Sequence, residues 1–157
     1  MKITILAIGK TNKGFIDQGI EEYLKRLKRY IKIGFNIIPD IKNSKNLPPE
    51  QLVNKEEELI LNALKTASDV ILLDEKGVEH TSKEFSQLLQ LKMLSGCKEL
   101  VFVVGGAYGV SDEVKKRINE KMAMSKLTFS HQMIRLIAIE QVYRAMTILK
   151  GDPYHHE

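Results

Sequence analysis

Two short runs made only of apolar residues constrain the fold of this 157-residue chain more than any other feature. Residues 70–73 read Val-Ile-Leu-Leu, and residues 100–104 read Leu-Val-Phe-Val-Val. Strands without a polar side chain on either face are typical of parallel sheets, because helices cover both faces of such sheets. The two runs therefore predict an α/β protein with a mostly parallel open sheet and flanking helices.

Strand and helix signals alternate along the whole chain, without an internal repeat or a low-complexity segment. Strands are expected at residues 2–8, 33–38, 70–73, 100–104 and 122–126. Helices are expected at residues 15–27, 50–65, 81–91, 111–119 and 132–149. Thr81 and Glu84 form a capping-box signature, Ser111 is a typical N-cap, and the polar residues 40–49 predict a loop. The length suits one domain, residues 1–157.

The helix expected at residues 132–149 is apolar around nearly its whole circumference. A helix of this kind is buried on more than one side. In a domain of this size a sheet covers one side only, so we expect the other side to pack against a second copy of the chain. The sequence thus predicts a homodimer.

Composition limits the class of protein. The single cysteine, Cys97, excludes an internal disulfide and a cysteine metal cluster, and a reducing, cytoplasmic compartment is expected. No apolar run is long enough to span a membrane. The apolar residues 3–8 are too few for the core of a signal peptide.

The formal net charge of +4 is unevenly distributed. Residues 1–32 carry eight Lys or Arg against three Asp or Glu, residues 33–112 eight against twelve, and residues 113–157 eight against five. A surface built from the two basic ends would suit a polyanion. Charge alone favours a simpler alternative, in which the basic residues form the solvated face of a helix. The strongest such run is Lys25, Arg26, Lys28 and Arg29.

The glycine-rich run at residues 105–109 follows an apolar strand, which is where open α/β sheets bind nucleotide-like ligands. It does not match G-x-G-x-x-G, and no Lys-Ser or Lys-Thr pair follows it, so a dinucleotide fingerprint and a P-loop are disfavoured. A tight turn that requires positive φ explains the glycines equally well.

His80 and His131 are isolated, so no metal site is expected. Glu140 and Arg144 have the spacing of a helical salt bridge.

Five ordered blocks carry a resemblance to a known family: MKITILAIGK at residues 1–10, VGGAYG at 104–109, SKLTFSHQ at 125–132, EQVYRA at 140–145 and PYHHE at 153–157. In these blocks the chain resembles the RlmH family, the SPOUT-class methyltransferases of large-subunit ribosomal RNA, over essentially its whole length. Two positions depart from the family pattern. Ser130 stands where many members have proline, and His156 stands where members usually have Arg or Lys.

The resemblance implies a trefoil-knotted α/β sheet and an active site that straddles a homodimer interface. It also implies transfer of a methyl group from S-adenosylmethionine to N3 of a pseudouridine in 23S rRNA, on the assembled ribosome. The implied catalytic residues are Arg144, Tyr154 and His155. The implied cofactor-binding residues are Leu73, Gly105, Met124, Ser125, Lys126, Leu127, Thr128 and Phe129.

Two other classes stay open beside this interpretation. One is a ribosome-binding factor of the same fold that has lost catalysis, against which the intact glycine loop and C-terminal block argue. The other is an oxidoreductase that binds a flavin or nicotinamide at residues 105–109, which would absorb visible light when purified.

Overall fold

A five-stranded sheet lies at the centre of the computed structural model, which describes residues 1–11 and 14–154. The strands are β1 (Lys2–Ile8), β2 (Lys32–Ile38), β3 (Asp69–Glu79), β4 (Glu99–Val104) and β5 (Glu120–Ala123). Their order is β2-β1-β4-β3-β5, and every neighbouring pair is parallel. The predicted parallel α/β architecture is confirmed. The trefoil knot concerns how the chain threads, which strand order does not specify, and it stays a prediction.

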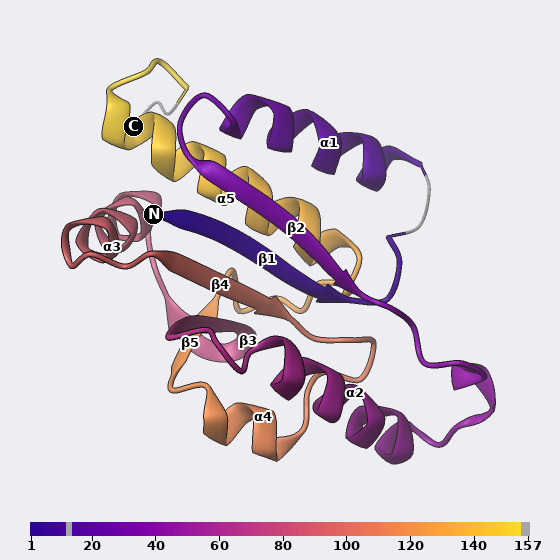
Figure 1. The fold of residues 1–157 in the computed structure, drawn as a ribbon. Coiled ribbons are helices and arrows are strands. Elements are labelled where there is room, and N and C mark those ends of the chain that lie inside the picture. The colour runs from indigo at the N-terminus through magenta and orange to yellow at the C-terminus, as the bar shows by residue number, and fades with distance from the viewer. Residues whose placement is uncertain (12–13, 155–157) are drawn as a thin grey trace.

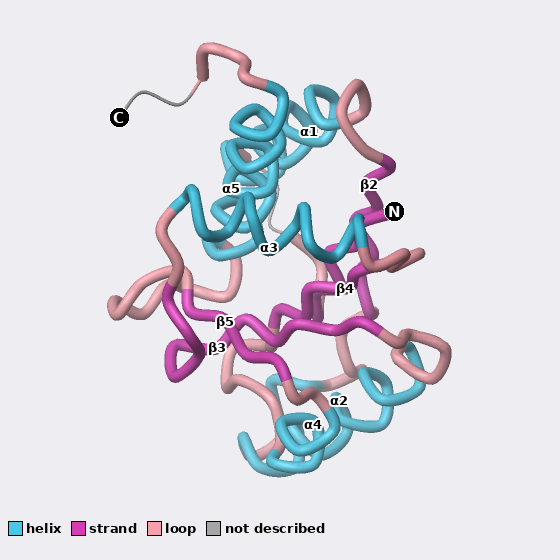
Figure 2. The backbone as a smooth tube through the Cα atoms, turned by 90° about the vertical axis from the view of Figure 1, so that its left-hand side faces the viewer, coloured by secondary structure: helices cyan, strands magenta, loops and turns pink. Residues whose placement is uncertain are grey.

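Helices cover both faces of the sheet, as Figures 1 and 2 show. One face carries α1 (Phe15–Leu27), α3 (Ser82–Leu94) and α5 (Met133–Lys150), and the other carries α2 (Pro49–Ala63) and α4 (Asp112–Arg117). A short 3-10 helix, η1 (Ser44–Asn46), lies within the loop expected at residues 40–49.

The central strand β4 explains why its sequence is wholly apolar. Phe102 contributes to the core beneath α1, α3 and α5, while Val101 and Val103 contribute to the core beneath α2 and α4. Successive side chains of a strand point to opposite faces, so a strand covered by helices on both sides has no position for a polar residue.

The predicted helix starts are confirmed at the level of individual hydrogen bonds. The Thr81 hydroxyl accepts the amide N–H of Glu84 at 3.2 Å, and the Glu84 carboxylate accepts the amide N–H of Thr81 at 2.7 Å. Ser111 accepts the amide N–H of Val114 at 3.2 Å. Several boundaries differ from those expected: α3 continues to Leu94, α4 ends at Arg117, and β5 covers 120–123 in place of 122–126.

Strand β3 is much longer than its apolar run. After Leu73 the chain shifts register by a bulge and pairs again with β5 from Val78 onward. Gly77 permits this second pairing, because a Cβ atom there would lie 2.5 Å from the backbone nitrogen of Met122. The bulge carries residues 74–77 out of the ladder at the carboxyl edge of the sheet.

Replacing Gly77 by Ala is therefore expected to lower the free energy of unfolding by about 2 kcal/mol, within the range for overpacking a close contact. Urea denaturation measures the loss. Gly34→Ala on the edge strand β2 is the matched control, since its Cβ would meet only side-chain atoms, at 3.3 Å or more. Equal stability of both variants would contradict the role assigned to Gly77.

The burial of α5 has a different cause from the one inferred from its sequence. Helix α5 packs between α1 and α3 in addition to the sheet, so its own chain covers three of its sides. The expectation that its own chain covers only one side of α5 is wrong. A narrower stripe stays half-exposed: Met133, Ile137, Gln141, Arg144 and Ile148. The homodimer itself stays a prediction.

Candidate functional site

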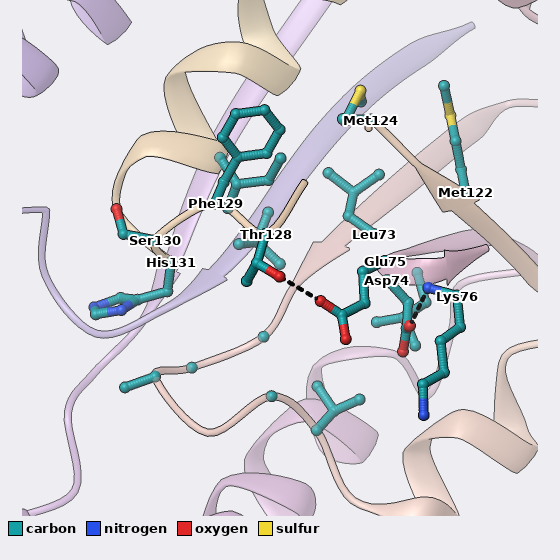
Figure 3. A pocket seen from close by; sticks show the side chains of 18 of the residues that line it. Leu73, Asp74, Glu75, Lys76, Met122, Met124, Thr128, Phe129, Ser130 and His131 are labelled. Atoms are coloured by element: carbon teal, nitrogen blue, oxygen red, sulfur yellow. Dashed lines mark hydrogen bonds between the residues drawn. The ribbon is translucent and has the colours of Figure 1, made fainter. Parts of the chain in front are cut away.

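A cavity of about 610 Å³ opens at the carboxyl ends of β3, β4 and β5. Three segments line most of it: residues 72–76 after β3's apolar run, residues 104–110 after β4, and 122–131 at the end of β5 and beyond. Figure 3 shows these side chains converging on one hollow. Parallel strands place their ligand sites at this edge, and the predicted glycine loop forms one wall.

Seven of the eight predicted cofactor-binding residues line this cavity: Leu73, Gly105, Met124, Ser125, Leu127, Thr128 and Phe129. Lys126 does not line the cavity, and its ammonium group lies 3.8 Å from the Glu79 carboxylate at the surface. Segments distant in sequence are thus brought together, although contact with a cofactor remains a prediction.

Gly105 lies in a close contact within its own loop. A Cβ atom on Gly105 would lie 3.0 Å from the carbonyl carbon of Gly109 and 3.1 Å from its oxygen. The Gly109 N–H donates to the Gly106 carbonyl at 3.1 Å, and Gly109 has a φ of +78°. The glycines therefore close the loop on itself, and the cavity wall depends on that closure.

A short charged segment that the sequence analysis missed also lines the cavity. Asp74, Glu75 and Lys76 directly follow the apolar run of β3. The Thr128 hydroxyl donates to the Glu75 carboxylate at 2.8 Å, which joins the β3 bulge to the 122–131 segment (Figure 3). The signal was present, because charges directly after a buried parallel strand lie at the ligand-binding edge.

Arg135 on α5 is a second residue whose role the sequence did not reveal. It is fully buried, at 0% exposure. Its guanidinium donates to the carbonyls of Gly9 at 2.9 Å and His131 at 3.0 Å, and also to the Ile8 carbonyl. The end of β1 is thereby tied to the segment that enters α5. The available signal was a charged residue within the apolar first turns of α5, residues 133–139.

The entry into α5 shows how the chain accommodates Ser130. The Ser130 hydroxyl accepts the amide N–H of Met133, the first residue of α5, at 3.2 Å. Next to it, His131 lines the cavity, and burial together with the positive charge of Arg135 lowers the pKa of its imidazole. The departure from the family pattern therefore supplies a helix-start hydrogen bond in place of a proline.

The predicted catalytic residues lie at the opposite end of α5. Arg144 is ten residues beyond the cavity-lining Ile134, about 15 Å along the helix axis at 1.5 Å per residue. Its guanidinium donates to Glu140 at 2.6 Å, so the salt bridge suggested by their spacing exists, and it also stacks over the ring of Tyr154 at 4.8 Å. His155 lies outside the described residues. One chain alone does not bring Arg144 and Tyr154 to the cavity.

Basic residues of α1 and the last basic residue of α5 lie at this same end. Lys25, Arg26, Lys28 and Arg29 are exposed near the end of α1, and Lys150 is exposed at the end of α5, against which α1 packs. Arg26 pairs with Glu22 at 2.8 Å. The end of the molecule that carries Arg144 and Tyr154 therefore presents a group of exposed basic side chains.

The cavity suits a ligand such as S-adenosylmethionine in size and in chemistry. Its volume lies within the roughly 300–1,000 Å³ typical of small-molecule sites. Leu73, Met122 and Phe129 offer apolar surface for an adenine ring. The segments 104–110 and 124–131 offer backbone donors and acceptors. The carboxylates of Asp74 and Glu75 suit a cationic ligand.

Two further observations bear on the class of protein. No helix among residues 1–11 and 14–154 is both long and apolar enough to cross a membrane. Within the same residues, no group of three or more His, Cys, Asp or Glu side chains is placed to hold a metal ion.

Solved structures of methylases share this fold. The tRNA (m1G37) methyltransferase from Aquifex aeolicus has a TM-score of 0.52 at 16% identity, over 100% of this chain and 75% of that chain. A putative methylase family protein from Neisseria gonorrhoeae has a TM-score of 0.52 at 12% identity, over 99% of this chain and 85% of that chain. The model of the predicted SPOUT methyltransferase family matches residues 1–155. Fold and family model together define the class as SPOUT methyltransferases.

Relatives in sequence narrow this class. The ribosomal RNA large subunit methyltransferase H of Parabacteroides distasonis is 57% identical over 157 residues, which is 100% of both chains. The protein of the same name from Bacteroides thetaiotaomicron is 51% identical over the same extent. The chain belongs to the ribosomal RNA large subunit methyltransferase H family of SPOUT methyltransferases.

Proposed function

We propose that the chain transfers a methyl group from S-adenosylmethionine to N3 of a pseudouridine in 23S rRNA of the large ribosomal subunit, in the cytoplasm and on the assembled ribosome. The observation that carries this proposal is the cavity, in which seven residues matching the family's cofactor-binding positions converge at the carboxyl edge of the sheet. The relatives' name supports the RNA substrate.

The chain's own residues would hold the cofactor mainly through backbone and shape. S-adenosylmethionine, when bound, supplies a methyl group on a positively charged sulfur. The glycine loop and the 124–129 segment would enclose the adenine and ribose, while Asp74 and Glu75 favour the cationic donor over its neutral demethylated product. Fixing the methyl carbon in line with the attacking nitrogen supplies most of the rate enhancement.

The RNA-facing half of the site would come from the other end of α5. N3 of pseudouridine loses a proton before it reacts, and a cationic group stabilises the resulting anion. We propose Arg144, Tyr154 and His155 for this half. Because Arg144 lies about 15 Å from the cavity along α5, one copy's cavity would work with the partner's Arg144 and tail across a homodimer interface. The half-exposed stripe on α5 supplies apolar surface for that interface.

A calorimetric titration tests the cofactor part of the proposal. The wild-type chain is expected to bind S-adenosylmethionine, whereas Gly105→Val, which forces the glycine loop open, is expected to weaken binding at least about tenfold. Gly34→Val on the edge strand β2 is the matched control and is expected to bind normally. A folded Gly105→Val chain with unchanged affinity would place the cofactor elsewhere.

The alternative function, an inactive ribosome-binding factor, makes a different prediction. It would be favoured if the wild-type chain bound both the cofactor and the ribosome without transferring a methyl group.

A further inference from the structure

The chain beyond α5 follows a fixed path over its own helices. Gly151 ends α5 with a left-handed conformation, at φ 72°. The amide N–H of Asp152 donates to the Thr147 carbonyl at 3.0 Å, and that of Tyr154 donates to the Asp152 carbonyl at 2.8 Å. The Tyr30 hydroxyl donates to the Asp152 carboxylate. Residues 151–154 are therefore held at several points.

Tyr154 ends this path inside a group of aromatic rings. Its ring meets that of Tyr143 edge to face, with centroids 4.8 Å apart and an interplanar angle of 70°. Tyr143 is only 5% exposed, and its ring also contacts Tyr23 at 5.6 Å and Tyr30 at 5.7 Å. We call Tyr23, Tyr30 and Tyr143 the tyrosine cradle. Edge-to-face packing of this kind is directional, so it fixes the orientation of the Tyr154 ring.

The hydroxyl of Tyr154 is already engaged within its own chain. It donates to the Glu140 carboxylate at 3.1 Å and lies 3.1 Å from the Tyr23 hydroxyl. Arg144 binds the same carboxylate at 2.6 Å and stacks over the Tyr154 ring. Burial, these hydrogen bonds and the Glu140 charge raise the pKa of the Tyr154 phenol, so the group keeps its proton. A phenol held in this state is poorly suited to accept a proton from an RNA base.

We infer that Tyr154 is a positioning residue. Its ring packs against Tyr143 of the tyrosine cradle, its hydroxyl binds Glu140, and together these contacts hold Arg144 and the described chain after α5 in place. The inference rests on the proposed function and refines it by separating the part of Tyr154 from that of Arg144 and His155. It also explains how a C-terminal segment, which is ordinarily frayed, is held in place.

Kinetics of methyl transfer to unmodified ribosomes separate anchoring from chemistry. Tyr154→Phe keeps the ring and is expected to lower kcat less than about fivefold, with the shape of the kcat–pH profile retained, since proton transfer by a lost hydroxyl would cost about a hundredfold. Tyr154→Ala is expected to lower kcat at least about fiftyfold, through lost positioning. Tyr143→Leu should reproduce that loss of kcat although Tyr143 is buried away from solvent. Tyr143→Phe, which keeps the ring, should retain a kcat close to that of the wild type. Affinity for S-adenosylmethionine should stay constant throughout.

Amide hydrogen exchange provides a readout that does not depend on methyl transfer. In Tyr143→Leu the protection of the Asp152 and Tyr154 amides is expected to fall at least about tenfold, because the opening of a local segment governs their exchange. Unchanged protection of these amides would overturn the inference. It would also be overturned if Tyr154→Phe lost as much rate as Tyr154→Ala together with one limb of its kcat–pH profile. The proposed function and the anchoring can fail separately. If the wild-type chain did not methylate ribosomes while Tyr143→Leu still lowered the protection of the Asp152 and Tyr154 amides, the proposed function would be refuted and the anchoring would stand.

Discussion

Deleting residues 153–157 is expected to lower methyl transfer to ribosomes by at least about a hundredfold, because positioning and acid–base contributions at the RNA base are lost together. None of the described residues in this segment lines the cavity, so the affinity for S-adenosylmethionine should stay within about twofold of the wild type. Single-turnover kinetics and calorimetry measure the two quantities separately. A deleted chain that methylates at the wild-type rate would remove Tyr154 and His155 from the site.

Mixing two inactive variants checks that the loss arises at a site shared between copies. Tail-deleted chains keep the cavity, and Gly105→Val chains keep Arg144 and the tail. If the site is composed of two copies, random pairing in a symmetric dimer should restore about a quarter of wild-type activity, since half the dimers are mixed and each has one complete site. No recovery in a mixture shown to form mixed dimers would contradict the shared site.

The second large effect is expected at Arg135. Arg135→Met removes a buried guanidinium and leaves the carbonyls of Ile8, Gly9 and His131 without their donor. Each buried acceptor left unsatisfied costs about 1–3 kcal/mol, so a loss of about 3 kcal/mol or more in the free energy of unfolding is expected.

Urea denaturation measures this loss, and Arg144→Met on the same helix is the matched control. Arg144 is partly exposed and pairs with Glu140 one turn away, so its replacement should cost only about 0.5 kcal/mol or less. Similar losses for the two variants would show that the hydrogen bonds of Arg135 to the end of β1 do not hold the fold together.

The sheet was predictable because its physical cause is local and simple. A strand covered by helices on both faces has only apolar positions, and residues 100–104 display that rule directly. The capping box at Thr81 was predictable for the same reason, since both partners lie within one turn.

What the sequence did not reveal depends on contacts between distant segments. The continuation of β3 beyond Leu73 rests on Gly77 fitting against the backbone of Met122, forty-five positions away. The burial of α5 by α1 and α3 is likewise a matter of tertiary arrangement, and an apolar circumference does not say which neighbour covers it. The apolar circumference of α5 could therefore not distinguish cover by α1 and α3 from cover by a second copy.

The candidate site was predictable only in part. Resemblance located seven cavity-lining residues, but it did not reveal that a Cβ atom on Gly105 would press against Gly109 of the same loop. It also left out Asp74 and Glu75, whose place at the cavity follows from the β3 bulge. The separation of Arg144 from the cavity became visible only once the cavity was seen to lie beside the start of α5.

A labelling experiment shows whether the chain methylates ribosomal RNA, and at which nucleoside. Ribosomes that lack the modification would be incubated with the wild-type chain and S-adenosylmethionine carrying an isotopically labelled methyl group, and the digested 23S rRNA would be analysed by mass spectrometry. We expect label in a single nucleoside, an N3-methylated pseudouridine, and none with the tail-deleted chain. Label on another nucleoside, or no label in RNA from ribosomes to which the chain and its cofactor are shown to bind, would contradict the proposed function.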